Sequence, residues 1–195
     1  MRFIIYLTIL LISLPALAQF AEGLHNQLIK MAQQNQHIHQ SLDKYAPENL
    51  PPALQSVASE IDNLHTQTLK EIVSLHGWPT KKQVGIQGIQ AAFILLKYSH
   101  DLVFQQDMLP LVIQSYLDKE GIAGKDVAEF TDKVSIKLGK KQVFGTQAEF
   151  IDGKVIFAAI ENPSSVDPLR AQMGMSSLAE YKTTLALLYG LQKHH

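Results

Sequence analysis

The sequence predicts an α+β protein that is mainly helical, with an N-terminal helical hairpin, a helical core and a small antiparallel β-hairpin. Two observations favour this class. From residue 20 to residue 137 apolar residues recur mostly every three or four positions, the spacing of one face of an α-helix. After Gly139 the pattern changes to short extended stretches around the turn sequence Asp152-Gly153.

The composition excludes several functions. The 195 residues carry 17 Lys and Arg against 18 Asp and Glu, a net charge of -1, so a nucleic-acid-binding surface is not expected. Hydrophobic residues make up 46% and charged residues 18%, as in an ordered globular protein. Because cysteine is absent, disulfides, thiolate nucleophiles and cysteine-ligated zinc are excluded.

Residues 1–18 have the three parts of a secretory signal peptide. A basic start at Arg2 precedes the apolar run 3–14 and the triplet Ala16-Leu17-Ala18. The run is shorter than the roughly 20 residues of a membrane-spanning helix. We therefore expect cleavage before Gln19 and a soluble, exported mature protein, periplasmic or secreted, that does not contact the membrane. Export without cysteine favours a bacterial protein.

The mature chain is predicted to be one domain, residues 19–195, made of a helical hairpin (19–77) and a core (78–192). The first helix spans residues 20–45, and the second ends at Gly77, which suits a helix C-cap. Six apolar residues of the second helix form a heptad-like seam interrupted by Thr68: Leu54, Val57, Ile61, Leu64, Ile72 and Leu75. The two helices are expected to pair in antiparallel fashion.

The core is predicted to continue with alternating helices and turns. A loop over 78–88 contains the capping-box pair Thr80 and Gln83. A buried helix over 89–96 and a turn at 99–101 follow, and then a helix over 104–116 that is bent at Pro110 and ended by Gly121 and Gly124. After a helix over 126–137, the segments 142–144, 147–151 and 154–160 are expected to be extended. A short helix starts at Asp167, and a last helix runs from the capping box of Ser177 and Glu180 to Gln192.

Neither a metal nor a cofactor is predicted. The pair His37 and His39 lies on a predicted helix, where residues two apart point about 200° away from each other. No zinc-protease motif, serine nucleophile elbow or phosphate-binding glycine loop is present in the sequence.

The first candidate site follows the buried helix at Ser99-His100-Asp101, with Gln105 four residues after Asp101. If a helix begins near Asp101, the two side chains share a face of its first turns. One interpretation is that the carboxylate caps the helix. The other is that Asp101 or His100 is a general acid or base beside an amide that orients substrate.

The second candidate site is the segment from Gln142 to Gln147. A bulge at Gly145 would turn Thr146 and Gln147 toward a ligand. The alternative is an ordinary edge hairpin with solvated polar residues.

In several motifs the chain resembles a widespread bacterial family of unknown function. The resemblance covers roughly residues 78–181. It rests on Trp78-Pro79 with Val84-Gly85, Phe104-Gln105 with Met108-Leu109, Asp132-Lys133-Val134, the Gly-Thr-Gln core of the 142–147 segment, and Val166-Asp167 to Gly174.

The chain departs from the family pattern at three motif positions. Lys97-Tyr98 replaces a Gln-His pair, Lys133 an arginine and Phe144 a tyrosine. If the family histidine is catalytic, either activity is lost here or His100 has taken its place. The resemblance implies a shared polar cleft lined by Asp101, Gln105, Gln147 and Arg170, with Tyr98 and Thr146 as further substrate-binding candidates.

Two functions follow from these patterns. The first is an exported, metal-independent hydrolase or transferase with a polar cleft for a small polar ligand, in which Asp101 or His100 moves protons and Arg170 holds an anionic group. The second is a non-catalytic, secreted, effector-like protein that docks to a protein partner through its N-terminal helical hairpin.

Overall fold

The computed structural model describes residues 2–188, and side chains from residue 18 onward. It confirms the mainly helical α+β class. The chain forms two compact units, which are described separately: Met1–Asp101 with Lys119–Gly121, and Leu102–Asp118 with Ile122–His195. The expected end of the last helix at Gln192 lies outside the described residues, and a single domain from residue 19 stays a prediction.

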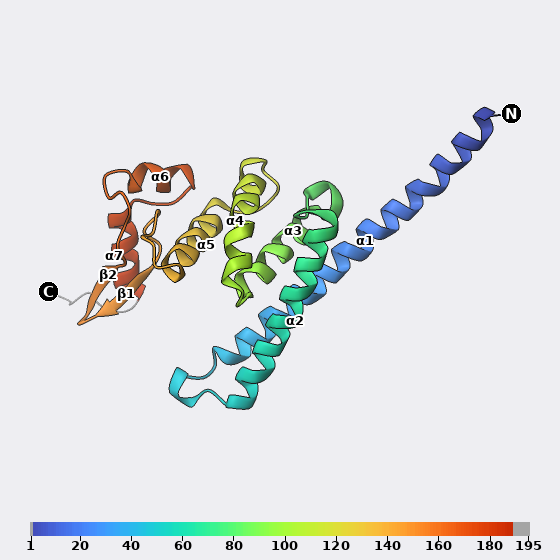
Figure 1. Ribbon diagram of the computed structural model, residues 1–195. Helices are drawn as coiled ribbons and strands as arrows, with labels where there is room; N and C mark the ends of the chain where they lie inside the picture. The colour runs from blue at the N-terminus through green and yellow to red at the C-terminus, as the bar shows by residue number, and fades with distance from the viewer. Residues whose placement is uncertain (1, 189–195) are drawn as a thin grey trace. The chain divides into compact units, whose positions relative to one another are not determined.

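The first unit contains α1 (Arg2–Leu42), a 3-10 helix (Pro47–Asn49), α2 (Pro52–His76) and α3 (Lys81–Tyr98). Helices α1 and α2 run antiparallel, which confirms the hairpin, and α3 packs against both (Figure 1). The α1 helix continues through the predicted cleavage site without a break.

The ends of these helices confirm two predicted caps and correct one loop. Gly77 has φ +75° and donates its N–H to the Val73 carbonyl. The Thr80–Gln83 capping box is present, and it starts α3 at Lys81. The prediction of a loop over 78–88 is therefore wrong beyond Thr80, because the box satisfies the first-turn N–H groups. Gly85, with φ +67°, interrupts the helix for a single residue.

The buried face of α2 shares only Ile72 with the predicted apolar seam. It is made of Ala58, Asp62, His65, Thr66, Leu69 and Ile72. Val57, Leu64 and Leu75 of the seam are 45%, 64% and 75% exposed. Hydrogen bonds explain this difference in burial. Asp62 and His65 are bonded to Asn35 of α1, and these bonds turn their face of α2 inward.

The second unit contains α4 (Leu102–Leu117), α5 (Gly124–Lys137), β1 (Ala148–Ile151), β2 (Lys154–Phe157), α6 (Val166–Gln172) and α7 (Leu178–Leu188). Pro110 lies inside α4, as predicted. Gly124 begins α5, whereas we expected it to end the preceding helix. A Cβ at Gly124 would lie 2.6 Å from the Met173 carbonyl oxygen, so the close approach requires glycine.

The two strands form an antiparallel hairpin (Figure 1), in which Ala148 pairs with Phe157. Asp152 and Gly153 both have positive φ, 49° and 71°, which is the type I′ turn expected for this pair. The predicted extended segment 142–144 makes only a bridge from Gln142 to Ile160, and the second strand ends at Phe157. The backbone N–H groups of Val143, Phe144 and Thr146 donate instead to the Asp132 side chain.

The last two helices are connected by side-chain caps. The predicted capping box is present: Glu180 accepts hydrogen bonds from the backbone and hydroxyl of Ser177. Helix α6 begins at Val166, one residue before the predicted start, and the Asp167 carboxylate accepts the Leu178 N–H at 2.7 Å. In the part of the chain that the structure describes, no helix has the length and apolarity needed to span a membrane.

Candidate functional site

A buried carboxylate lies at the centre of the first unit. Asp62 is 2% exposed and projects from the inner face of α2 toward α1. Burying an ionised carboxylate is costly unless it is paired and hydrogen-bonded. The groups around Asp62 meet this requirement.

Three side chains surround the Asp62 carboxylate. Asn35 donates from Nδ2 to Oδ1 at 2.5 Å. The Nε2 atom of His39 lies 3.1 Å from Oδ1 and 2.9 Å from Oδ2. The Nε2 atom of His100 lies 3.5 Å from Oδ2, within ion-pair distance. Asp62 therefore has two imidazoles on one carboxylate.

The buried His65 extends this cluster. Its Nδ1 atom is hydrogen-bonded to Oδ1 of Asn35, whose amide nitrogen holds Asp62. Desolvation by burial lowers the pKa of His65 below its ordinary value, and the Asp62 charge opposes this shift only in part. His65 is therefore a neutral member of the cluster near pH 7.

The two surface-facing members are His39 and His100. The His39 ring stacks on Tyr98, with centroids 3.9 Å apart and planes 16° from parallel. Burial, followed by the charges of Asp43 and Asp62, raises the pKa of the Tyr98 phenol, so the hydroxyl remains a hydrogen-bond donor at neutral pH. The His100 side chain is 56% exposed, which leaves its ring accessible to solutes.

Asp101, next to His100, forms an ion pair with Lys70 of α2 at 2.5 Å. Both side chains are about one-third exposed. The Asp101 N–H is also bonded to the buried Ser99 hydroxyl at 3.2 Å. This pairing positions the turn that carries His100.

The second unit has a different buried carboxylate. Asp132 of α5 is fully buried and accepts hydrogen bonds from the 142–147 segment. Its Oδ1 accepts the N–H groups of Val143 at 2.7 Å and Phe144 at 3.0 Å. Its Oδ2 accepts the N–H and the hydroxyl of Thr146, both at 2.9 Å. These bonds replace the strand pairing predicted for this segment.

The Gln142 side chain forms hydrogen bonds to the other end of the same segment. Its amide nitrogen donates to the carbonyls of Gln147 at 3.0 Å and Ala158 at 2.8 Å, and its Oε1 accepts the Gln147 N–H at 2.8 Å. The Gln147 side chain donates to the Thr146 hydroxyl at 3.0 Å. Gly145 has φ +67°, in the left-handed region that favours glycine, and a bulge that turns Thr146 and Gln147 toward a ligand stays a prediction.

Arg170 of α6 is 1% exposed and completes the network. Its Nε donates to the Ser176 carbonyl at 2.7 Å and its NH1 to the Phe144 carbonyl at 2.8 Å. The guanidinium carbon also lies 4.8 Å from the Tyr181 ring centroid. Burial lowers the pKa of Arg170, while Tyr181, Asp167 and Asp132 oppose the shift. These contacts make Arg170 a support for the 142–147 segment.

The predicted site residues fall into two groups. Tyr98, His100 and Asp101 belong to the first unit, whereas Gln105, Thr146, Gln147 and Arg170 belong to the second. Thr146, Gln147 and Arg170 meet around the 142–147 segment, and Gln105 is fully buried in α4. Substrate binding by this second group stays a prediction.

Sequence reasoning considered His39 only as a possible metal ligand beside His37, and it did not select Asn35, Asp62 or His65 as site residues. The signal was present as two polar pairs at helical spacing, Asn35 with His39 and Asp62 with His65, on helices expected to pair. His37 is exposed while His39 turns inward, as the helical interpretation of that stretch required. Among the side chains described from residue 18 to residue 188, no group of three or more His, Asp or Glu is arranged to hold a metal ion.

Comparison with known families identifies the chain. Residues 22–194 match a family described as a family of unknown function (DUF6624). The chain belongs to this family. The DUF6624 match includes the helical hairpin, which the motif resemblance had left outside, so the hairpin is part of the family architecture. No curated protein and no solved structure matches the chain significantly.

Proposed function

We propose that this DUF6624 protein is an exported acid–base catalyst, a hydrolase or group-transfer enzyme for a small polar substrate, with His100 as its proton-transferring group. The observation that carries the proposal is the buried Asp62 carboxylate 3.5 Å from a half-exposed imidazole. A carboxylate that orients an accessible histidine is a common arrangement for general acid–base catalysis, and it needs no metal ion.

The 3.5 Å contact with Asp62 supports a different role for each imidazole nitrogen of His100. The ionised Asp62 carboxylate can accept hydrogen bonds but cannot donate them. It therefore favours the His100 tautomer that carries its proton on Nε2. The lone pair of Nδ1 is then free to take a proton from an attacking water or substrate hydroxyl. The same nitrogen returns that proton to the leaving group when the bond to it breaks. Asn35 and His39 hold Asp62 in place during both steps.

The neighbours of His100 give the substrate site its character. Tyr98, whose ring stacks on His39 of the same cluster, has a hydroxyl that stays protonated and would supply a hydrogen-bond donor. The ion pair of Lys70 with Asp101 borders the same turn. Donors beside a base suit a substrate with a polar acyl or phosphoryl group, whose oxygen gains negative charge during attack.

Replacing His100 by alanine tests the proposed function. We expect the purified protein to hydrolyse at least one of p-nitrophenyl acetate, p-nitrophenyl phosphate and bis-p-nitrophenyl phosphate. The His100→Ala variant should lose about 100-fold or more in kcat/KM, the usual contribution of a general base. Asp62→Asn should lose activity as well, and added imidazole should restore part of the activity of His100→Ala.

The matched control is His37→Ala, which removes an exposed histidine from α1 outside the cluster. Its activity should equal that of the unchanged protein. Absence of hydrolysis with all three probes, or equal activity in His100→Ala and the control, would refute the proposal.

Export is the second part of the proposal and rests on the residue 1–18 pattern. Cleavage after Ala18 would leave an α1 helix that begins at Gln19 and keeps the cluster residues Asn35 and His39. When the full chain is expressed in a bacterial host, mass spectrometry of the protein from the periplasm and medium should find Gln19 at the N-terminus. Protein that retains Met1 and stays in the cytoplasm would contradict export.

A further inference from the structure

Helix α2 carries an apolar face that the first unit does not bury. We define the outer stripe as Val57, Ile61, Leu64, Thr68 and Leu75. Three of these residues are between 45% and 75% exposed. Their spacing of three, four and seven residues is the pattern by which one helix packs along another. The outer stripe lies roughly 100° around the helix from the buried face, so the core and the stripe do not compete.

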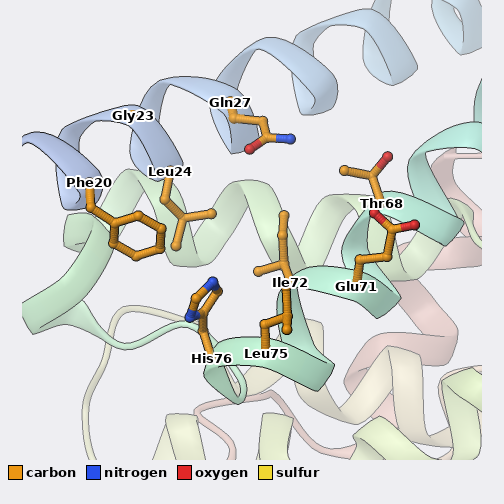
Figure 2. Close-up of a pocket in the computed structure, with 9 residues that line it drawn as sticks. All are labelled: Phe20, Gly23, Leu24, Gln27, Thr68, Glu71, Ile72, Leu75 and His76. Atoms are coloured by element: carbon orange, nitrogen blue, oxygen red, sulfur yellow. The ribbon is translucent and has the colours of Figure 1, made fainter.

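The outer stripe ends in a hollow between α1 and α2. This groove has a volume of about 480 Å³ and is lined by Phe20 and Leu24 from α1 and by Ile72 and Leu75 from α2 (Figure 2). The Phe20 ring contacts His76, with centroids 4.8 Å apart. Gln27, Thr68, Glu71 and His76 also line the groove, so its lining is mixed. The apolar part of a hollow of this size accepts a large side chain from a partner, which is how helix interfaces are commonly anchored.

The charge beside the outer stripe is negative. Glu60 and Glu71 are exposed on the same flank of α2, and Glu71 also lines the groove. Within residues 18–188, neither carboxylate forms an ion pair. The nearby Lys70 is paired with Asp101.

This charge argues against a second copy of the chain as the occupant. Parallel pairing of two α2 helices in register would place each glutamate opposite its own copy. Antiparallel pairing centred between Leu64 and Thr68 would bring Glu60 of one helix near Glu71 of the other. Like charges across a helix interface are destabilising, whereas Lys or Arg at these places would be favourable.

We propose that the outer stripe and its groove dock a basic amphipathic helix of a partner protein. The stripe from Val57 to Leu75 is about 27 Å long, so the partner helix has about 18 residues. Its apolar residues recur every three or four positions, a large one enters the groove, and Lys or Arg on one flank faces Glu60 and Glu71. This inference concerns a surface separate from His100 and does not depend on catalysis.

Synthetic peptides test this proposal by fluorescence anisotropy with the full chain. The first peptide has leucine at three- and four-residue spacing with lysine on the flanks, the second has glutamate for lysine, and the third has the first composition in scrambled order. The lysine peptide should bind about tenfold or more tightly than either other peptide. Its advantage over the glutamate peptide should shrink as salt is raised.

Variants of the chain locate the site. Leu64→Ser combined with Leu75→Ser should weaken binding of the lysine peptide about tenfold, since apolar anchors dominate such interfaces. Leu117→Ser, a similarly exposed leucine on α4, is the matched control and should bind normally. Glu60→Lys combined with Glu71→Lys should reverse the preference in favour of the glutamate peptide, without removing any apolar contact.

Four results of the peptide experiments would overturn the proposal. These are no binding of the lysine peptide, equal binding of the scrambled peptide, normal binding by the double serine variant, and unchanged preference in the double lysine variant. Sedimentation that shows a dimer abolished by Leu64→Ser would assign the outer stripe to a second copy of the chain. All the substituted side chains are exposed, so circular dichroism should show the same helical content in every variant.

Discussion

Replacing Asp132 by alanine is expected to lower the free energy of unfolding by about 3–5 kcal/mol, because three N–H groups and one hydroxyl lose a charged acceptor together. Val143, Phe144 and Thr146 all donate to this fully buried carboxylate. Each buried donor left without a partner costs about 1–3 kcal/mol. Urea unfolding followed by circular dichroism measures the change.

Two further variants show whether the loss of stability in Asp132→Ala comes from the lost hydrogen-bond acceptors. Asp132→Asn keeps one carbonyl acceptor but turns an amide N–H₂ toward N–H donors, so its loss should approach that of alanine. Asp107→Ala removes an exposed carboxylate from α4 and should change the free energy by less than about 0.5 kcal/mol. A loss below about 1 kcal/mol in Asp132→Ala would show that the 142–147 segment holds its shape without this carboxylate.

Replacing Arg170 by methionine should lower the free energy of unfolding by about 2–4 kcal/mol. The shorter, uncharged side chain leaves the carbonyls of Phe144 and Ser176 without their donors. It also removes the cation from the Tyr181 ring. Urea unfolding again gives the difference.

Arg170→Lys should recover only part of this loss, because a single ammonium group does not reproduce the two separated N–H donors of the guanidinium. Lys182→Met, which changes an exposed cation on α7, is the control and should be nearly neutral. Full stability in Arg170→Lys would mean that positive charge alone matters. Asp132→Ala and Arg170→Met together should cost less than their sum, because both residues hold Phe144.

Local signals in the sequence predicted the local structure well. The Gly77 cap, the capping boxes at Thr80 and Ser177, and the Asp152-Gly153 turn each depend on a few adjacent residues. Such motifs are stabilised by bonds within a few positions of the chain, so spacing alone identifies them. The prediction of a loop over 78–88 was wrong beyond Thr80, because the capping box starts a helix that only Gly85 interrupts.

The burial of α2 illustrates what apolar spacing does not decide. Its heptad-like seam predicted an apolar packing face, yet Val57, Leu64 and Leu75 are exposed and the face with Asp62 and His65 turned inward. The matching Asn35 and His39 lie more than twenty residues earlier, on another helix. Hydrogen bonds to residues far away in the chain therefore decide which face of α2 is buried. The sequence of α2 alone does not show which face this is.

The sequence by itself determined the mainly helical α+β class and the order of most elements, because periodicity and capping act over short chain distances. It also gave His100, from the polar turn, and Tyr98, from the family resemblance, as site candidates. Only the tertiary structure decided that His100 approaches a buried aspartate, and that Asp132 and Arg170 hold the 142–147 segment. A buried charge is stable only with partners beside it, and folding, not chain order, brings those partners together.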